Sequence, residues 1–154
     1  MNEHITIRRP IESDIKFLAE NIREADKAEV EAFGITVSDI IKVTFDCKNA
    51  DNHTALYDGV PMAMFGTHKE SPIGVTATIW MLGTSDVGKC PRELITKARE
   101  VISKGLLENV ELMNYIDCRY KKTLRWLKHL GFSFGEPFVL GVNGEEFIKA
   151  SIRR

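Results

Sequence analysis

The sequence predicts an α/β domain in which helices cover a mixed β-sheet. The main observation is an apolar strand at 75–82 that runs through a short polar loop, 83–90, into an amphipathic helix. A second apolar strand at 110–116 then leads into a helix that stops at Gly131. Strands that alternate with helical patterns are typical of crossover connections between parallel strands. We therefore expect the strands 75–82 and 110–116 to be adjacent and parallel.

Length and composition predict one domain over residues 1–154. With 44% hydrophobic and 28% charged residues, the chain can build one core. A net charge of −1 gives no overall attraction to nucleic acid or anionic lipid. No stretch reaches the roughly 18 apolar residues of a membrane span, and the N-terminal segment has no apolar region of a signal peptide. We expect a cytoplasmic protein.

The cysteines and histidines give no metal-binding pattern. Three cysteines, Cys47, Cys90 and Cys118, are odd in number and far apart, which suits a reducing compartment. None of the four histidines stands at a ligand spacing from them. We expect no metal.

The N-terminal third predicts a strand followed by helices. Residues 6–8 form the strand, and Pro10 opens a helix that has acidic residues in its first turn. The apolar residues on one face of this helix are Ile15, Leu18 and Ile22. Gly34 is expected to end the next helical region.

A capping box predicts the helix that precedes the sheet. The Thr36 hydroxyl is placed to bond the amide of Asp39, while the Asp39 carboxylate reaches back. The residues at helical spacing behind this cap are Val37, Ile40, Ile41, Thr44 and Phe45.

The centre of the chain predicts a β-hairpin and then the long helix. Strands 53–57 and 60–65 flank Asp58-Gly59, and Asp-Gly supplies the positive φ angles of a type I′ turn. After the strand at 75–82, the apolar residues at helical spacing are Leu94, Ala98, Val101, Ile102 and Leu106. Gly105 is placed near the end of this helix.

The chain ends in short extended pieces. Segments 138–142 and 146–152 flank a predicted turn at Asn143-Gly144. The resulting order of strands and helices is β-α-α-β-β-β-α-β-α-β-β.

This order resembles the GNAT-type N-acetyltransferase superfamily element by element. Several short motifs also resemble a phage-encoded branch that includes the acetyltransferase-like internal core protein of short-tailed phages. The segments that carry the narrower resemblance are 26–31, 63–66, 80–84, 91–92, 114–119, 125–127 and 130–132.

The resemblance implies a mixed, mostly antiparallel central sheet with helices on both faces. It also implies acetyl-CoA as co-substrate and a small-molecule or protein amine as acceptor. The alternative is a catalytically inactive GNAT-fold phage protein that serves in the virion core or contacts a host protein. Fold alone does not decide between the two.

The loop that would hold the CoA diphosphate departs from the superfamily pattern Gln/Arg-x-x-Gly-x-Gly/Ala. Only Gly88 is present, Asp86 adds a repelling charge, and Pro91 lacks an amide donor. Lys89 and Arg92 are cations that could pair with phosphates. By resemblance, the residues that bind the cofactor are Met81 and Leu82 for the pantetheine and Ser85, Val87, Gly88, Lys89 and Arg92 for the diphosphate. A plain strand-to-helix connection is the alternative.

The superfamily commonly uses a tyrosine as general acid toward the CoA thiolate, in the pattern Asn-x-x-Ala-x-x-x-Tyr. Counted back from Gly131, the three defined positions are Tyr120, Thr123 and Leu127. Leucine cannot donate a proton. Tyr120, Tyr115 and Cys118 are possible substitutes, each with a simpler interpretation as a packing residue. Tyr120 is preferred, since it starts the same helix.

The general base is sought in the N-terminal helical region, which in the superfamily borders the acceptor site. Glu29 is the preferred base, and Glu31, His53 and His68 are alternatives. A solvated acidic helix face is the simpler interpretation of both glutamates. Trp80 is interpreted as a core residue rather than as an acceptor wall.

The last predicted helix has a basic exterior. The five cations within ten residues are Arg119, Lys121, Lys122, Arg125 and Lys128, and most of them lie opposite Thr123, Leu127 and Leu130. A solvated face is the simplest interpretation. The functional alternatives are contacts with CoA phosphates, with phage DNA or with an acidic partner protein.

Overall fold

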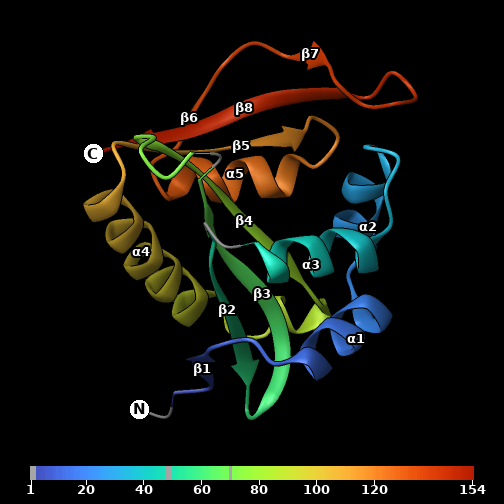
Figure 1. Ribbon diagram of the computed structural model, residues 1–154, viewed down its shortest axis with the longest axis vertical. Helices are drawn as coiled ribbons and strands as arrows, with labels where there is room; N and C mark the ends of the chain where they lie inside the picture. Colours follow the sequence, from blue (N-terminus) through green and yellow to red (C-terminus); the bar gives the residue numbers. More distant parts are fainter. Residues whose placement is uncertain (1–2, 48–49, 70) are drawn as a thin grey trace.

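The computed structural model describes residues 3–47, 50–69 and 71–154 (Figure 1). Within these residues the chain forms a mixed, mostly antiparallel sheet in the order β1-β2-β3-β4-β5-β8-β6, with β7 paired to β8. The strands are β1 Ile5–Arg8, β2 Ala50–Tyr57, β3 Val60–His68, β4 Thr76–Gly83, β5 Glu111–Asp117, β6 Ser133–Phe134, β7 Phe138–Val139 and β8 Glu146–Arg153. The helices are α1 Glu12–Asn21, α2 Glu24–Glu31, α3 Val37–Asp46, the 3₁₀ turn η1 Ser85–Gly88, α4 Pro91–Glu108 and α5 Lys121–His129. The predicted fold class is confirmed.

Helices cover both faces of the sheet, as Figure 1 shows. On one face, α1, α2 and α3 pack on β3 and β4 around buried Leu18, Ile41 and Met64. On the other face, α4 and α5 pack on β5 and β8 around buried Ile102 and Leu112. Because side chains alternate along a strand, successive residues of β4 serve the two faces in turn.

The predicted parallel pairing of β4 with β5 is confirmed, but it is short. It covers only residues 76–78 of β4 against 111–113 of β5. From there β4 stays paired with β3 up to Gly83, and β5 stays paired with β8 up to Asp117. Each strand follows its outer neighbour, so the two separate after Thr78. The separation therefore begins well before the end of β4.

Most of the turns and helix ends predicted from the sequence are present in the structure. Asp58 and Gly59 have φ angles of 47° and 86°, as the type I′ turn requires. The Thr36 hydroxyl accepts from the Asp39 amide at 3.2 Å, but the predicted return bond to the Asp39 carboxylate does not form, so only half of the capping box is present. Gly131 has φ 103°, and the amide of Phe132 donates to the Leu127 carbonyl at 3.0 Å, which ends α5 where it was predicted to end.

Two details of the structure differ from the sequence predictions. Ile22 lies just beyond the end of α1, and β6 was not predicted. Gly105 lies in the last turn of α4, near the helix end as predicted, and the buried Leu112 side chain packs against it. A Cβ at Gly105 would lie 2.9 Å from Leu112 Cδ1. Close helix-to-strand packing explains this glycine.

Asp14 is a buried carboxylate that joins β1, α1 and β2. It accepts from Arg8 Nη1 and Nη2 at 2.7 and 2.9 Å, and from the Thr54 hydroxyl at 2.7 Å. Burial alone would raise the pKa of Asp14. The hydrogen bonds from Arg8, from the Ile11 amide and from Thr54 lower the pKa by more than burial raises it, so the pKa lies below its ordinary value.

We expect Asp14→Asn to lower the free energy of unfolding by ~2–3 kcal/mol at pH 7, because it breaks a buried, charge-assisted network. Since the folded-state pKa is depressed, the stabilisation is present above the unfolded-state pKa and is lost as pH falls through the folded-state pKa. Urea unfolding at pH 7 and at pH 3 checks this. Glu20→Gln, on the exposed face of α1, is the control. Equal destabilisation by Asp14→Asn at both pH values would contradict the prediction.

Candidate functional site

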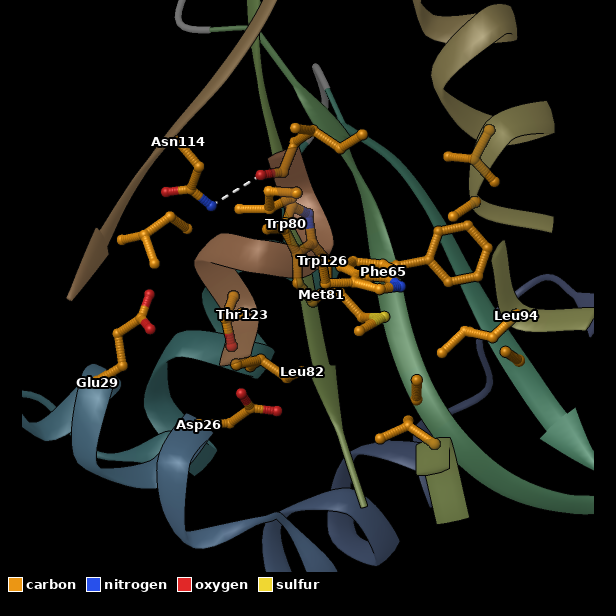
Figure 2. Close-up of a pocket in the computed structure, with 18 of the residues that line it drawn as sticks. Asp26, Glu29, Phe65, Trp80, Met81, Leu82, Leu94, Asn114, Thr123 and Trp126 are labelled. Atoms are coloured by element: carbon orange, nitrogen blue, oxygen red, sulfur yellow. Dashed lines mark hydrogen bonds between the residues drawn. The ribbon is translucent and has the colours of Figure 1, made fainter. Parts of the chain in front are cut away.

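A cavity of about 780 Å³ lies where β4 and β5 separate, and it reaches both faces of the sheet. Its walls come from β3, β4, β5, α2, α4 and α5. At the point of separation the Asn114 side-chain amide donates to the Ile79 carbonyl at 2.7 Å (Figure 2). This bond satisfies a carbonyl of β4 at the place where the β-ladder stops.

On the α2 side, two carboxylates project toward β4 and the start of α5 (Figure 2). Asp26 is already paired, since it accepts from the Gly83 amide at 2.8 Å and from the Arg23 guanidinium at 2.9 Å. The Arg23 amide also donates to the Gly83 carbonyl at 2.9 Å. Helix α2 is therefore anchored to the end of β4, and Asp26 has a structural role in this anchor.

Glu29 lines the cavity one turn further along α2. Burial raises the pKa of its carboxyl to about 8, and the nearby charges of Asp26 and Asp117 raise it too. A hydrogen bond with the Asp117 backbone and the charge of Arg23 act in the opposite direction. A carboxyl whose pKa lies near neutrality suits general base catalysis.

Several backbone amides of the loop after β4 are bonded within the loop itself, so they are not free to bind a phosphate. The loop forms the 3₁₀ turn η1, in which the amides of Asp86 and Val87 bond Thr84 and the Lys89 amide bonds the Asp86 carbonyl. Ser85, Val87 and Gly88 line the cavity together with Met81 and Leu82. A Cβ at Gly88 would meet no atom within 4 Å, so space is open beside this backbone.

The two cations predicted to hold phosphates do not line the cavity. Lys89 Nζ lies 2.9 Å from Asp86 Oδ1 and over the Tyr57 ring, and Arg92 is exposed on the first turn of α4. Asp86, interpreted from the sequence as a repelling charge, is instead the partner of Lys89. The lysines that do line the cavity are Lys97 on α4 and Lys122 on α5. Lys97 was missed, although it follows Leu94 at helical spacing.

The candidate acids are spread around the start of α5. Tyr120 is half-buried and does not line the cavity, but its pKa responds to the charges of Glu29 and Asp26. Burial raises the pKa of its phenol, so the phenol stays protonated at neutral pH. Leu127 and Thr123, from the same superfamily pattern, both line the cavity. The role of Tyr120 stays a prediction.

The other candidates lie in different surroundings. Tyr115 lines the cavity, and Cys118 does not. Glu31 is exposed and His53 stacks on Phe65 beside Asp51, both outside this cavity, whereas His68 lines it. Trp80 packs against the α1–α3 core and also lines the cavity, so both interpretations of this residue describe part of its position.

The basic exterior of α5 is present as predicted. The side chains of Lys121, Lys122, Arg125 and Lys128 are exposed, while Thr123 and Leu127 face inward. Among the residues that the structure describes, no three potential ligands gather as a metal site requires. In the same part of the chain no helix is both long and apolar enough to cross a bilayer.

Comparison with solved structures identifies the fold. No family model matches the sequence, and no curated protein matches it. A protein described as a probable acetyltransferase superimposes with a TM-score of 0.74 at 21% identity, over 99% of this chain and 94% of that chain. A chimera of spermidine N-acetyltransferase SpeG from Vibrio cholerae and hSSAT gives 0.72 at 15% identity, over 98% and 96%. yncA from Salmonella typhimurium, solved with its cofactor acetyl-CoA, gives 0.67 at 12% identity, over 98% and 94%.

The chain therefore has the fold of GNAT-type acetyltransferases. The similarity extends over almost the whole length of each chain. It lends no support to the narrower resemblance to a phage core protein, which stays a prediction.

Proposed function

We propose that this protein is an acyl-CoA-dependent N-acetyltransferase that acts on a small-molecule amine. The observation that carries the proposal is the cavity at the separation of β4 and β5, with Glu29 facing it from α2. The GNAT fold and a neighbour that binds acetyl-CoA support the choice of acetyl donor.

The residues present fit acetyl-CoA as substrate. The apolar strand residues Met81 and Leu82 suit the pantetheine, and the open backbone at Gly88 leaves room for the diphosphate. The acidic residue of the loop is already paired with Lys89, so it adds less repulsion than its charge alone indicates. Lys97 and Lys122 supply positive charge to the cavity.

In the proposed reaction the acceptor amine attacks the thioester carbonyl. The nitrogen–carbon bond forms, the carbon–sulfur bond breaks, and ionised Glu29 takes the proton that the nitrogen loses. Tyr120 is the proposed acid that protonates the departing thiolate. The products are an N-acetylated amine and CoA.

A thermal-shift titration with acetyl-CoA tests the proposal directly. A ligand that binds only the folded state stabilises it by ~2.7 kcal/mol at 100 times its Kd. Release of free thiol, measured with a panel of amines, tests for transfer. Binding together with thiol release is expected. Neither binding nor transfer would contradict the enzyme and favour a binding protein with a GNAT fold.

The cations of the cavity offer a second test. We expect Lys97→Glu combined with Lys122→Glu to weaken acetyl-CoA binding by ~1.5–3 kcal/mol for each charge-assisted hydrogen bond to phosphate that is removed. We expect a smaller effect from Lys89→Glu combined with Arg92→Glu, because Lys89 is paired with Asp86. Isothermal titration calorimetry measures both.

Lys128→Glu, on the exposed face of α5, is the matched control for the change of charge. If the Lys89 and Arg92 pair proves to be the sensitive one, the diphosphate lies on the loop as the sequence predicted. Lys97 and Lys122 would then have no part in binding it.

A further inference from the structure

We propose that the acceptor is a primary monoamine with an apolar, preferably aromatic, body, and not a polyamine. This inference rests on the proposed function, since it names the acceptor class of the same cavity. It is carried by two independent features of the α2 side of the site, which are the charge of the lining and the aromatic rim.

The charges that line the cavity do not suit a polycation. The acidic residues of the lining are Asp26 and Glu29, whereas Arg23, Lys97 and Lys122 are basic. Asp26 is neutralised by Arg23 and the Gly83 amide. Glu29, whose pKa is about 8, is mostly uncharged at neutral pH. Within the described residues, a second or third ammonium group would therefore meet no unpaired carboxylate in this lining.

The rim of the cavity on this side is apolar. Phe33, Ile35 and Tyr115 line the cavity and are also 40%, 39% and 37% exposed. Side chains that are both exposed and part of the lining mark where the cavity opens to solvent. Large apolar side chains at such a mouth are typical of a site that takes an apolar ligand.

The two aromatic rings of the rim are held in place by the C-terminal strands. Phe33 packs on buried Phe147 of β8 with 4.9 Å between ring centroids. Tyr115 meets Phe138 of β7 edge to face at 5.6 Å. The Val142 amide donates to the Ala32 carbonyl at 2.8 Å, which ties the loop between β7 and β8 to the end of α2. The rim is thus built before a ligand arrives.

Glu29 and Phe33 are four residues apart, at the end of α2 and the turn that follows it. Both line the cavity, with Val30 and Trp80. A ligand with its nitrogen at Glu29 and a ring between Phe33 and Tyr115 would therefore meet one polar group and an apolar wall. A ligand with one amine and one aromatic ring so placed is an arylalkylamine.

The experiment is calorimetric titration of the whole protein with 2-phenylethylamine and with spermidine at pH 7, where Glu29 is mostly uncharged, alone and with CoA. We expect 2-phenylethylamine to bind at least ~10-fold more tightly. Tyr115→Ala and Phe33→Ala should each weaken its binding by about 10-fold and leave spermidine unchanged. Val139→Ala, 65% exposed and outside the cavity lining, is the matched control. Tyr115 lies on an exposed strand position, so that variant remains informative if Phe33→Ala is poorly folded.

A gain of function gives the converse test. Ile35→Glu places a permanent negative charge at the mouth of the cavity. It should improve spermidine binding by several-fold, which is about the effect of one attraction between a carboxylate and an ammonium group near a protein surface. Tighter binding of spermidine than of 2-phenylethylamine by the unmodified protein would overturn the inference, as would failure of both amines to bind. Acetyl-CoA binding, measured separately, decides the proposed function, so the two failures are distinguishable.

Discussion

Glu29→Gln is expected to lower kcat/KM for acetyl transfer by ~10²–10⁴-fold, the range that general base catalysis contributes. Glutamine keeps the shape of the side chain and its contact with the Asp117 backbone region, but it cannot take a proton. Steady-state release of CoA thiol measures the change. Glu31→Gln, on the exposed end of the same helix, is the control.

The pH dependence of acetyl transfer by the unmodified protein should report the same group. Since a general base acts only when ionised and the pKa of Glu29, the proposed base, is about 8, kcat/KM should rise with pH and level off above pH 8. Glu29→Gln should remove this rise. A profile that keeps its inflection in Glu29→Gln would assign the base to another residue.

The raised pKa of Glu29 also has a consequence for stability. The carboxyl ionises near its ordinary pKa in the unfolded chain and near 8 in the folded one, so the unfolded state binds fewer protons between these values. The free energy of unfolding therefore falls as pH rises through this window. Glu29→Gln should remove that loss and stabilise the protein above pH 8 by on the order of 2 kcal/mol, after a discount for partial exposure. Chemical denaturation at pH 6 and pH 9 checks this.

The arrangement of β4 and β5 shows how much of the fold can be predicted from the sequence. Both strands and their parallel pairing follow from apolar runs joined by a helix of crossover length. The point of separation does not follow, because it depends on how long β4 stays with β3 and β5 with β8. Those pairings join residues far apart in sequence, and no local pattern encodes where they stop.

The candidate base shows the same limit at the level of one side chain. From the sequence, Glu29 and Glu31 belong to one acidic helix, and nothing local separates them. In the structure Glu29 lies against the end of β5 near Asp117, while Glu31 faces solvent. Burial and a neighbouring carboxylate make the difference, and both are tertiary. Lys97, by contrast, could have been found, since helical spacing from Leu94 places it on the inward face of α4.

The loop after β4 illustrates an error of a different kind. The sequence interpretation counted Asp86 and Lys89 as separate charges, one harmful and one helpful for phosphate binding. They are three residues apart in a 3₁₀ turn, a geometry in which side chains at i and i+3 eclipse each other, and they form an ion pair of 2.9 Å. Attention to the turn type would have paired them.

Tyr120→Phe is expected to lower kcat for acetyl transfer by up to ~10²-fold, the lower end of what general acid help contributes. The phenol is held protonated by burial near the carboxylates of α2, but it does not line the cavity, so its contribution requires a water or a small shift of the ring. An effect on kcat that leaves acetyl-CoA affinity unchanged distinguishes proton donation from a packing role.

Leu127→Tyr is the complementary variant. Leu127 lines the cavity at the position where the superfamily pattern has its tyrosine, and it lies two helical turns beyond Tyr120. A phenol there should restore kcat in the Tyr120→Phe background by ~10-fold or more, because Leu127 lines the cavity directly from the helix that Tyr120 precedes. Leu127→Phe carries the ring without the hydroxyl and is the matched control. If Leu127→Tyr and Leu127→Phe have the same kcat, protonation of the thiolate does not limit turnover, and Tyr120 has no role as an acid.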